Sequence, residues 1–506
     1  MSASLVAGER VVSDPQYLKS IPGVVSSLKA TFAKGVTKDK NWRVQQLKGL
    51  LKMFTENRDK ICEGLNKDMK RDHFCSFVSE LAATELEIQH AISNLSDWAK
   101  SKSLPVSLAN KPGHAELVPE PLGVVLLMSS WNFPYLTLIQ PAIGAIAAGN
   151  CVLLKPASLA GHSSIIIADL IPKYLDPAAV AVIEGGAETG SILLEEKFDK
   201  IMYTGGCGVA KIVMAAAAKH LTPVALELGG KNPCIVTDSV VDIQLAARRV
   251  AWGRFAINAG QICISPDYLL VHESIGDEFV SLVEQSVKEF FLDSPEKSEY
   301  NSRIINESHT KRIANILNLD KNFIAFGGNV DISDKYIAPT ILNFKTDLEA
   351  FTNSQAMKDE IFGPVLPVYY FKDLDWCLSF INQRDKPLTL SVFASAADAK
   401  IVAGSTSSGS VTINDCLTQK SELEIPFGGV GASGFGRYNG KYSFETFSHY
   451  KPILHRSIKS DVDAKYPPYS PAKREIFNHL HQYLLGHKSL VTLGIRMVTY
   501  NMKTKQ

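Results

Sequence analysis

Cys263 is the residue of this sequence best suited to nucleophilic chemistry. It lies in the segment NAGQICISPD, residues 258–267, between a glycine-containing bend and a proline. A helix that ends near Ile257, followed by Asn-Ala-Gly, puts Cys263 on a tight loop where a substrate can reach the sulfur. On this segment alone, an inert buried thiol remains the alternative, because free cysteines are usually buried.

Glu227 is the matching candidate for acid–base chemistry. It is an isolated acid in the apolar run VALELGGKNP, and Gly229 and Gly230 follow it closely. An unpaired carboxylate in apolar surroundings has a raised pKa, which suits it to accept a proton near neutral pH. The alternative is a glutamate that points into a solvated cleft.

Asn132 is a candidate for holding developing negative charge. In SSWNFPYLT, its amide stands between Trp131 and Phe133, at the end of a buried strand and before Pro134. A side-chain N–H aimed at a tetrahedral oxygen stabilises the transition state by roughly 2.7 to 4 kcal/mol. The alternative is an asparagine that makes a backbone turn bond before proline.

Two glycine-rich strings compete for a dinucleotide phosphate site. GVGASG, Gly429–Gly434, satisfies the pattern Gly-x-Gly-x-x-Gly, but no apolar strand leads into it and no amphipathic helix follows, so we assign it to structural turns. TGGCGVAK, Thr204–Lys211, follows the strand KIMYT and opens an alanine-rich helix. Its glycines Gly205, Gly206 and Gly208 let phosphates approach the backbone and the helix N-terminus.

Composition limits the classes of protein that can carry these residues. The 506 residues correspond to about three domains or lobes at ~150 residues each. With 45% hydrophobic and 21% charged residues, the chain has the balance of a packed soluble protein. Its net charge of +1 gives no global field for nucleic acid. The eight cysteines contain no Cys-x-x-Cys pair, which indicates free thiols in a reducing compartment and no metal site.

An alternation of strands and helices must position the candidate residues. Apolar residues at three- and four-residue steps predict helices over residues 20–100, and Leu117–Ser130 is predicted to form one buried strand. The later strand candidates are Cys151–Lys155, Ala181–Gly185, Lys200–Thr204 and Asn232–Asp238. The later helix candidates are Ser163–Leu175, Val209–His220, Ile243–Phe255, Gly276–Phe291 and Asp375–Gln383. This rhythm predicts an α/β fold with a helix-wrapped parallel sheet and a second alternating lobe.

Taken together, the motifs resemble the aldehyde dehydrogenase superfamily. WNFP, LLKP, ELGGKNP, GQIC, EIFGPVLP and PFGGVGASGFG follow that family's order and spacing over about residues 20–456. TPVALELGGKNPC, CISPDYLL, INQRDKPL and KYSFETFSHYK are similar to the class 3 branch, which includes fatty aldehyde dehydrogenases. The resemblance implies oxidation of medium- or long-chain aliphatic or aromatic aldehydes to carboxylic acids, with NAD or NADP as cofactor.

The resemblance also implies a role for each candidate residue. Cys263 resembles the nucleophile that carries a thiohemiacetal and then a thioester, and Asn132 with the Cys263 backbone N–H resembles the oxyanion hole. Glu227 resembles the base that activates the hydrolytic water. The residues that resemble the family's cofactor-binding positions are Lys155, Gly205, Gly206, Gly208, Ala210, Glu360 and Phe362. For Glu360 and Phe362, a strand-end turn with a buried phenylalanine is the alternative.

Two positions depart from the class 3 pattern. Ala210 stands where class 3 members usually have a glycine, so its methyl group tightens the packing there. Ser158, in LLKPASLAG, stands where many members have a glutamate. Loss of that carboxylate removes a partner for the ribose hydroxyls and a repulsion toward a 2′-phosphate, so it favours NADP as an alternative to NAD.

The resemblance implies a Rossmann-like cofactor-binding domain, a catalytic α/β domain, a small strand-based oligomerisation segment that forms a homodimer, and a tail. The cofactor-binding domain comprises residues 1–96 and 121–226, and the catalytic domain comprises residues 227–417. The oligomerisation segment comprises residues 97–120 and 418–456, and the tail comprises residues 457–506.

The tail is basic and amphipathic. Over Ala472–Gln506 its lysines and arginines outnumber its single acid, Glu475, and its apolar residues lie near helical spacing. Lys488 and Arg496 interrupt it too soon for the ~20 apolar residues of a membrane span. The tail can lie in a membrane interface or pack on a partner subunit over the substrate entrance, and both alternatives stay open.

The N-terminal residues MSASLVAGERVVSDPQ lack the apolar core of a secretory signal. We therefore expect a cytoplasmic protein, with any membrane contact at the cytosolic face of an intracellular membrane.

Two rival functions remain. A cofactor-free cysteine hydrolase needs a histidine base, and only His272 lies close to Cys263 in sequence. A non-catalytic scaffold is disfavoured by the presence of all three catalytic residue types.

Overall fold

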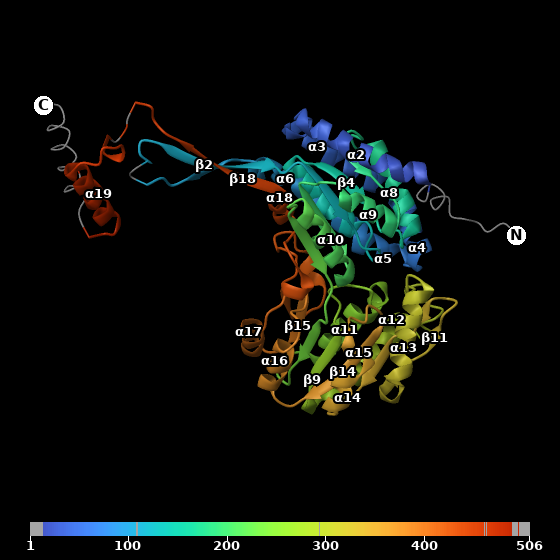
Figure 1. Ribbon diagram of the computed structural model, residues 1–506. Helices are drawn as coiled ribbons and strands as arrows, with labels where there is room; N and C mark the ends of the chain where they lie inside the picture. The colour runs from blue at the N-terminus through green and yellow to red at the C-terminus, as the bar shows by residue number, and fades with distance from the viewer. Residues whose placement is uncertain are drawn as a thin grey trace. The chain divides into compact units, whose positions relative to one another are not determined.

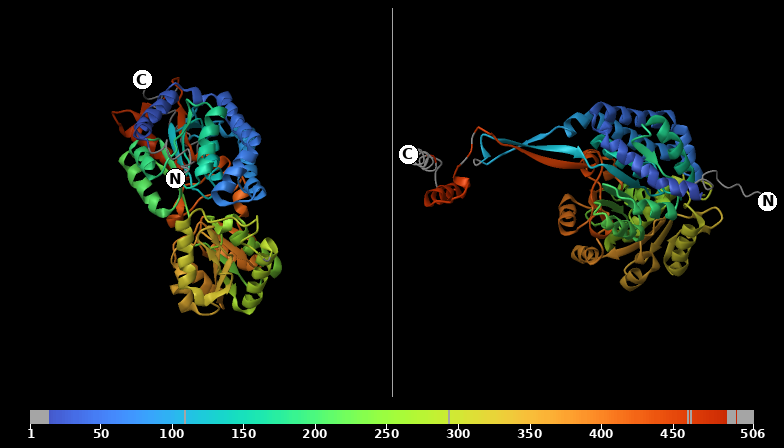
Figure 2. Two further views of the ribbon diagram at one scale, coloured as in Figure 1. Left: turned by 90° about the vertical axis from the view of Figure 1, so that its right-hand side faces the viewer. Right: turned by 45° about the horizontal axis from the view of Figure 1, so that its top comes forward.

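The computed structural model describes residues 14–107, 110–292, 294–459, 461, 463–487 and 494. The chain divides into two units (Figure 1). Unit 1 comprises Met1–Lys100 and Pro119–Tyr450, and unit 2 comprises Ser101–Val118 and Lys451–Gln506. Unit 1 contains two α/β lobes, which Figure 2 shows from two further directions.

The first lobe opens with helices, as the apolar spacing predicts. They are α2 (Pro15–Ala33), α3 (Lys40–Glu56), α4 (Arg58–Met69), α5 (His73–Ser76) and α6 (Ala83–Trp98). The spacing places Ile21, Val25 and Leu28 on the buried side of α2. Helix α3 begins after Asp39, whose carboxylate accepts a hydrogen bond from the Asn41 N–H and so satisfies a free helix-end donor.

A six-stranded sheet forms the centre of this lobe, in the order β17-β7-β6-β3-β4-β5. Its strands are β3 (Val124–Met128), β4 (Cys151–Lys155), β5 (Val180–Val182), β6 (Lys200–Gly205), β7 (Val224–Leu228) and β17 (Gly434–Phe435). All neighbours are parallel except β17. The connecting helices are α7 (Leu136–Ala148), α8 (Gly161–Tyr174), α9 (Ala187–Glu195) and α10 (Cys207–Lys219). The strand order reverses between β3 and β6, and ligands of such sheets bind beside this point, at the carboxyl ends of the strands.

The prediction of one strand over Leu117–Ser130 is wrong. Two strands in different sheets occupy this stretch, β2 (His114–Pro121) and β3. They are separated at Gly123, which has a φ of +146° and where an added Cβ would lie 1.9 Å from Asp199 Oδ2. The same Asp199 oxygen accepts a hydrogen bond from the Val124 N–H at 2.7 Å. This contact requires a glycine and sets the start of β3.

The second lobe contains a seven-stranded sheet in the order β10-β13-β14-β9-β8-β15-β16. Its strands are β8 (Pro233–Val236), β9 (Tyr268–His272), β10 (Ile324–Phe326), β13 (Thr340–Asn343), β14 (Val365–Phe371), β15 (Thr389–Phe393) and β16 (Ser410–Ile413), with a small pair β11 (Val330–Asp331) and β12 (Tyr336–Ile337) beside them in the sequence. Only β10 is antiparallel to its neighbour.

Helices cover both faces of this sheet. They are α11 (Ile243–Ala251), α12 (Gly276–Phe291), α13 (Glu307–Leu319), α14 (Leu348–Asn353), α15 (Gln355–Lys358), α16 (Leu374–Asn382) and α17 (Ala396–Ser405). Neighbouring strand residues alternate between two cores: Ile235 and Leu270 lie in one, and Cys234 and Leu269 in the other. This alternation is what a sheet buried on both sides requires.

The stretch after the second lobe returns to the first. Helix α18 (Lys441–Thr446) packs on α7, and β17 pairs with β7. The GVGASG string forms a turn at Gly431–Ser433 followed by β17, in agreement with its assignment to structural turns. By its packing, this stretch up to Tyr450 therefore belongs to unit 1.

Unit 2 contains a three-stranded sheet and a short helical segment. The sheet has the order β1-β2-β18, with β1 (Lys102–Leu104) and β18 (Ser448–His455) at its edges. Helix α19 (Pro471–Leu484) begins after Ser470, whose hydroxyl accepts a hydrogen bond from the Lys473 N–H. Tail residues beyond 487, apart from Gly494, lie outside the described residues. Within the described part of the chain, no helix has the length and apolarity that a membrane span requires.

Candidate active site

A cleft of about 860 Å³ in unit 1 is lined by residues of both lobes. The strand register explains how the first lobe contributes to it. Met128 at the end of β3 is opposite Lys155, and Thr204 of β6 is opposite Glu227. Since these strands are parallel, their carboxyl ends and the loops that follow meet at one edge of the sheet. The cleft begins at this edge.

Cys263 lies on a loop with unusual backbone conformation. Asn258, Ala259 and Gly260 have positive φ angles of 51°, 49° and 70°. A left-handed conformation costs about 1–3 kcal/mol at a non-glycine residue and persists only where surrounding contacts enforce it. One such contact is the Asn232 side-chain amide, which donates to the Cys263 carbonyl at 2.7 Å. The Cys263 side chain is partly exposed and lines the cleft.

Glu227 and Cys263 affect each other's protonation. Burial raises the pKa of Glu227 to about 7, and a hydrogen bond with the Cys263 thiol and the positive charge of Lys420 oppose this rise. Burial also raises the pKa of Cys263 well above its ordinary value, and the carboxylates of Glu227 and Glu360 raise it further. The thiol is therefore protonated at neutral pH, beside a carboxylate that can accept its proton.

Asn132 is 3% exposed and also lines the cleft. Its Oδ1 accepts a hydrogen bond from Ser130 Oγ at 2.6 Å, and its Nδ2 donates to the Gln261 carbonyl at 2.9 Å. These contacts hold the amide in one orientation. Because an amide nitrogen carries two N–H groups, one donor remains for a ligand.

The predicted cofactor residues of the first lobe lie in the cleft only in part. Lys155, Gly205 and Gly206 line it, whereas Gly208 and Ala210 do not. Lys155 Nζ donates to the Gly185 carbonyl at 2.8 Å, and burial lowers its pKa to about 8. A Cβ at Gly206 or Gly208 would meet no atom within 4 Å, so the backbone at the start of α10 is open. Ala210 is 2% exposed and faces the core of the first lobe.

Glu360 and Phe362 reach the cleft from the segment before β14. Burial raises the pKa of Glu360 to about 8, and the negative charge of Asp267 adds to the rise. A Cβ at Gly229 would lie 2.1 Å from Glu360 Oε2, so the glycine leaves the space that this carboxylate occupies. Phe362 has a φ of +49° and packs edge-on against Trp131, with 5.3 Å between the ring centroids.

Comparison with known proteins decides the family. The family model described as "Aldehyde dehydrogenase family" matches residues 26–453. This chain belongs to the aldehyde dehydrogenase family. It is 44% identical over 459 residues to "Aldehyde dehydrogenase, dimeric NADP-preferring" of Mus musculus, covering 90% of this chain and 99% of that protein. It is 42% identical over 452 residues to "Aldehyde dehydrogenase family 3 member A2" of Rattus norvegicus, covering 89% and 92%.

A solved structure, the substrate-bound state of Staphylococcus aureus AldH, superposes with a TM-score of 0.88 at 37% sequence identity, covering 91% of this chain and 99% of that one. These matches confirm the predicted family, its class 3 character and the α/β fold class. As an aldehyde dehydrogenase, the chain is an oxidoreductase that acts on aldehydes with NAD or NADP, as the sequence motifs indicated.

The cleft of this aldehyde dehydrogenase fits a dinucleotide. Within the described residues, Thr204 Oγ1, Glu227 Oε1 and Glu360 Oε1 are buried without a hydrogen-bond partner, and all three residues line the cleft. Buried polar groups are normally hydrogen-bonded, so these oxygens are available to a ligand. The open backbone at the start of α10 adds N–H groups that suit phosphate oxygens.

Sequence reasoning missed His309 and Arg312, which line the aldehyde dehydrogenase cleft from α13. The Arg312 guanidinium donates to the Ile361 carbonyl at 2.6 Å, and the Ile361 N–H donates to Asp267 at 3.2 Å. Arg312 and Asp267 therefore anchor the segment that carries Glu360. No local pattern marks residues on a helix this far from the nucleophile loop. His272, the base of the rival hydrolase, contacts Ser274 and the Lys372 carbonyl and does not line the cleft.

Proposed function

We propose that this aldehyde dehydrogenase works through a covalent intermediate on Cys263. The observation that carries the proposal is the convergence of the Cys263 thiol, the Glu227 carboxylate and the Asn132 amide on one cleft. In the first step Glu227 accepts the thiol proton, the sulfur bonds to the aldehyde carbon, and the carbonyl π electrons move to oxygen. The Asn132 N–H and the Cys263 backbone N–H then stabilise the oxygen of the thiohemiacetal.

Bound NAD or NADP supplies the oxidation by accepting hydride from the substrate carbon. Lys155 and Glu360 would hold its ribose hydroxyls, the backbone of Gly205 and Gly206 its phosphates, and Phe362 would pack near its ring. Gly208 and Ala210 would support this site through the first turn of α10. Cys263 then holds the substrate as a thioester.

The last step releases the product. Glu227 first releases to solvent the proton that it took from the thiol, and it then accepts a proton from a water molecule, whose oxygen bonds to the thioester carbon. The carbon–sulfur bond breaks, the carboxylic acid leaves, and the proton passes from Glu227 to the sulfur. A pKa of about 7 lets Glu227 both accept and return a proton near neutral pH.

Mass spectrometry of the protein trapped during turnover tests this mechanism. The expected result is an acyl adduct on Cys263 and no adduct on the other seven cysteines, which serve as internal controls. The Cys263→Ala variant is expected to lose activity by on the order of 10⁶-fold, as enzymes do on losing a nucleophile. An adduct elsewhere, or an active Cys263→Ala variant, contradicts the mechanism. Reduction of the nicotinamide on adding an aldehyde separates it from the cofactor-free hydrolase.

For the substrate we propose medium- or long-chain aliphatic or aromatic aldehydes, supported by the similarity to family 3 relatives. We also propose that NADP is accepted beside NAD, because exposed Ser158 at the cleft introduces no negative charge against a 2′-phosphate. A steady-state series of aldehydes of increasing length, run with each cofactor, tests both statements.

For assembly we propose a homodimer formed through residues 97–120 and 418–456. The support is β18, an edge strand of the unit 2 sheet with mostly exposed side chains, and the dimeric name of one relative. Edge strands present unpaired backbone groups to another chain. The cofactor-binding domain then comprises residues 1–96 and 121–226, and the catalytic domain residues 227–417. Sedimentation of the native protein tests the dimer.

For the tail we propose peripheral contact with a membrane, at the cytosolic face of an intracellular membrane in a cytoplasmic protein. Phe477, Leu484 and Leu485 are 42%, 57% and 53% exposed, and Arg474 lies near them in sequence. Deletion of residues 472–506 is expected to abolish sedimentation with anionic vesicles. If the deleted protein still sediments with vesicles but no longer forms the oligomer, the tail packs on a partner subunit and does not bind the membrane.

A further inference from the structure

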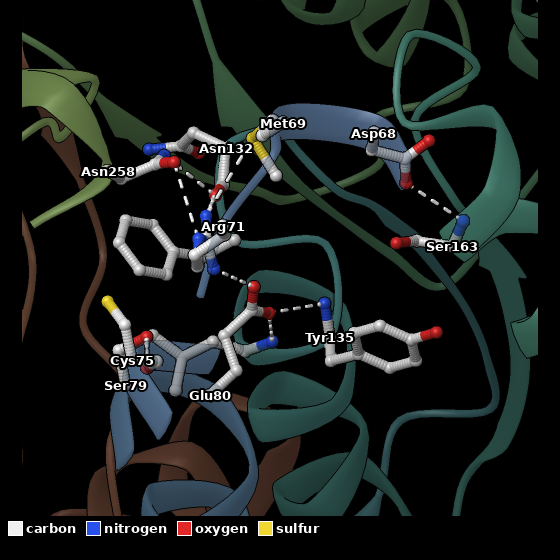
Figure 3. Close-up of polar contacts among 12 residues, drawn as sticks. Asp68, Met69, Arg71, Cys75, Ser79, Glu80, Asn132, Tyr135, Ser163 and Asn258 are labelled. Atoms are coloured by element: carbon white, nitrogen blue, oxygen red, sulfur yellow. Dashed lines mark hydrogen bonds and ion pairs between the residues drawn. The ribbon is translucent and has the colours of Figure 1, made fainter. Parts of the chain in front are cut away.

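Arg71, just after α4, is a buried cation behind the active-site loops (Figure 3). Its side chain is 0% exposed, as is that of Glu80, which accepts a hydrogen bond from Arg71 Nη1 at 2.6 Å. The guanidinium also lies over the Phe133 ring, 4.6 Å from its centroid. Neither Arg71 nor Glu80 lines the cleft.

The other guanidinium donors reach both loops that carry the proposed chemistry. Arg71 Nη2 donates to the Asn132 backbone carbonyl, and Nε donates to Asn258 Oδ1 at 3.3 Å (Figure 3). Asn258 Nδ2 in turn donates to the same Asn132 carbonyl at 3.1 Å. One side chain therefore joins the loop of Asn132 to the strained loop that leads to Cys263.

Glu80 holds the other end of the Asn132 loop. Its second carboxylate oxygen accepts the backbone N–H of Tyr135 at 2.9 Å and of Leu136 at 3.1 Å, at the start of α7. The ion pair thus binds the loop through a carbonyl at one end and two amides at the other. Residues 132–136 cannot shift without breaking a charged hydrogen bond.

The two loops are also bonded directly to each other. Asn132 Nδ2 donates to the Gln261 carbonyl at 2.9 Å, and Gln261 Nε2 donates to the Asn258 carbonyl at 3.0 Å. A buried ion pair is weak evidence for added stability, because removing both charges from water is costly. What this pair does provide is a fixed relation between the oxyanion donor and the nucleophile loop.

We propose that Arg71, paired with Glu80, is a positioning residue for the covalent step. It contacts neither substrate nor cofactor, and it acts by setting where the Asn132 amide lies relative to the Cys263 sulfur. The inference rests on the roles proposed for Asn132 and Cys263. Because the pair bonds the backbone of the Asn132 loop and the Asn258 side chain of the Cys263 loop, its loss affects the rate of the covalent step far more than the binding of the cofactor.

The Arg71→Lys variant tests the proposal. A lysine keeps the charge but presents its donors from one point, so it cannot reach Glu80, Asn132 and Asn258 together. We expect kcat to fall about 10²-fold, the usual cost of a misplaced catalytic group. The dissociation constant of NADP, measured on the purified variant, is expected to stay unchanged. The alkylation rate of Cys263 by iodoacetamide is expected to change in the same preparation.

Arg43→Lys is the matched control. Arg43 is a partly buried arginine of the first lobe, and like Arg71 it donates to backbone carbonyls, but these are the carbonyls of Thr37, Lys38 and Ala147, away from the cleft. This variant is expected to lower the melting temperature without lowering kcat.

Glu80→Gln is the second test variant, because it keeps an acceptor for Tyr135 and removes the charge. It is expected to lower kcat while cofactor affinity stays constant, even where Arg71→Lys fails to fold.

The outcomes separate this inference from the proposed function. If Cys263→Ala is inactive and both Arg71→Lys and Glu80→Gln keep the parent kcat, the positioning role is wrong and the mechanism stands. The role is also wrong if kcat and cofactor affinity fall together in the folded variants, because that indicates general loss of structure. An active Cys263→Ala variant overturns the mechanism itself.

Discussion

The two ends of the cleft are built differently. At the reacting end, the Asn132 loop and the Cys263 loop are joined by buried hydrogen bonds, and Asn258 is held at a positive φ. At the other end, Gly206 presents open backbone and Ser158 is exposed. In the proposed mechanism the reacting end therefore depends on the relative position of side chains, whereas the cofactor end depends on access to the backbone.

After the loss of the nucleophile itself, the largest expected effect again tests the reacting end. Asn132→Ala removes the proposed oxyanion donor, and kcat is expected to fall about 10²- to 10³-fold. The dissociation constant of NADP is expected to stay constant, because α10 is untouched. Asn343→Ala is the control, since the Asn343 amide donates to Tyr370 Oη at 2.9 Å and the residue does not line the cleft. Equal losses in kcat for the two variants would remove the contrast between the ends.

The next effect concerns discrimination at the cofactor end. Ser158→Glu introduces a carboxylate that repels a 2′-phosphate and can accept bonds from ribose hydroxyls. The ratio of kcat/KM with NADP to that with NAD is expected to fall about 10- to 100-fold, in line with the cost of opposing like charges. Ser158→Gln, of similar size but uncharged, is expected to change the ratio much less. An unchanged ratio in Ser158→Glu places the 2′-phosphate elsewhere.

A smaller effect appears in the pH dependence. Glu227 must be ionised to act as a base, so kcat/KM is expected to rise with pH through about 7. The charge of Lys420 lowers the pKa of Glu227, so Lys420→Met is expected to raise this pKa and move the acidic limb to higher pH. Lys219→Met, which removes an exposed partner of Glu195, is the control. If the acidic limb of the kcat/KM profile moves to lower pH in Lys420→Met, the proposed effect of the Lys420 charge on Glu227 is wrong.

The smallest effect sharpens the picture of the cofactor end. A Cβ at Gly208 meets no atom within 4 Å, and alanine favours a helix over glycine by about 0.5–1 kcal/mol. Gly208→Ala is therefore expected to raise the free energy of unfolding slightly, in a denaturant titration, with cofactor affinity unchanged. Gly205→Ala is the contrast, since its Cβ would lie 2.3 Å from Tyr203 Oη. If Gly208→Ala binds the cofactor more weakly, the backbone at Gly208 contacts the cofactor directly.

Local patterns predicted much of the fold. The helices before residue 100 and the strand–helix alternation follow from apolar periodicity, which any single stretch of chain displays. The strand over Leu117–Ser130 failed because the break at Gly123 depends on the carboxylate of Asp199, far away in sequence. Strand β7, which carries Glu227, was not among the strand candidates, since its acid interrupts the apolar run.

The candidate site shows the same division. Cys263, Glu227 and Asn132 stand in motifs that can be recognised one at a time, and the structure brings all three to one cleft. Ala210 stands where its motif usually has a glycine, and it faces the core, because the first turn of α10 rotates that position away from the cleft. Arg312 and Arg71 carry no local signal, since their contacts come from elements distant in the chain.

The amino-acid sequence alone determined the family, the α/β class and the types of side chain available for chemistry, because these depend on residue identity and short-range spacing. Tertiary structure alone decided which oxygens are buried without a partner, how far burial raises the pKa of Glu227 and Glu360, and that one guanidinium joins two loops. These properties depend on dielectric surroundings and on distances between segments, and both exist only once the chain has folded.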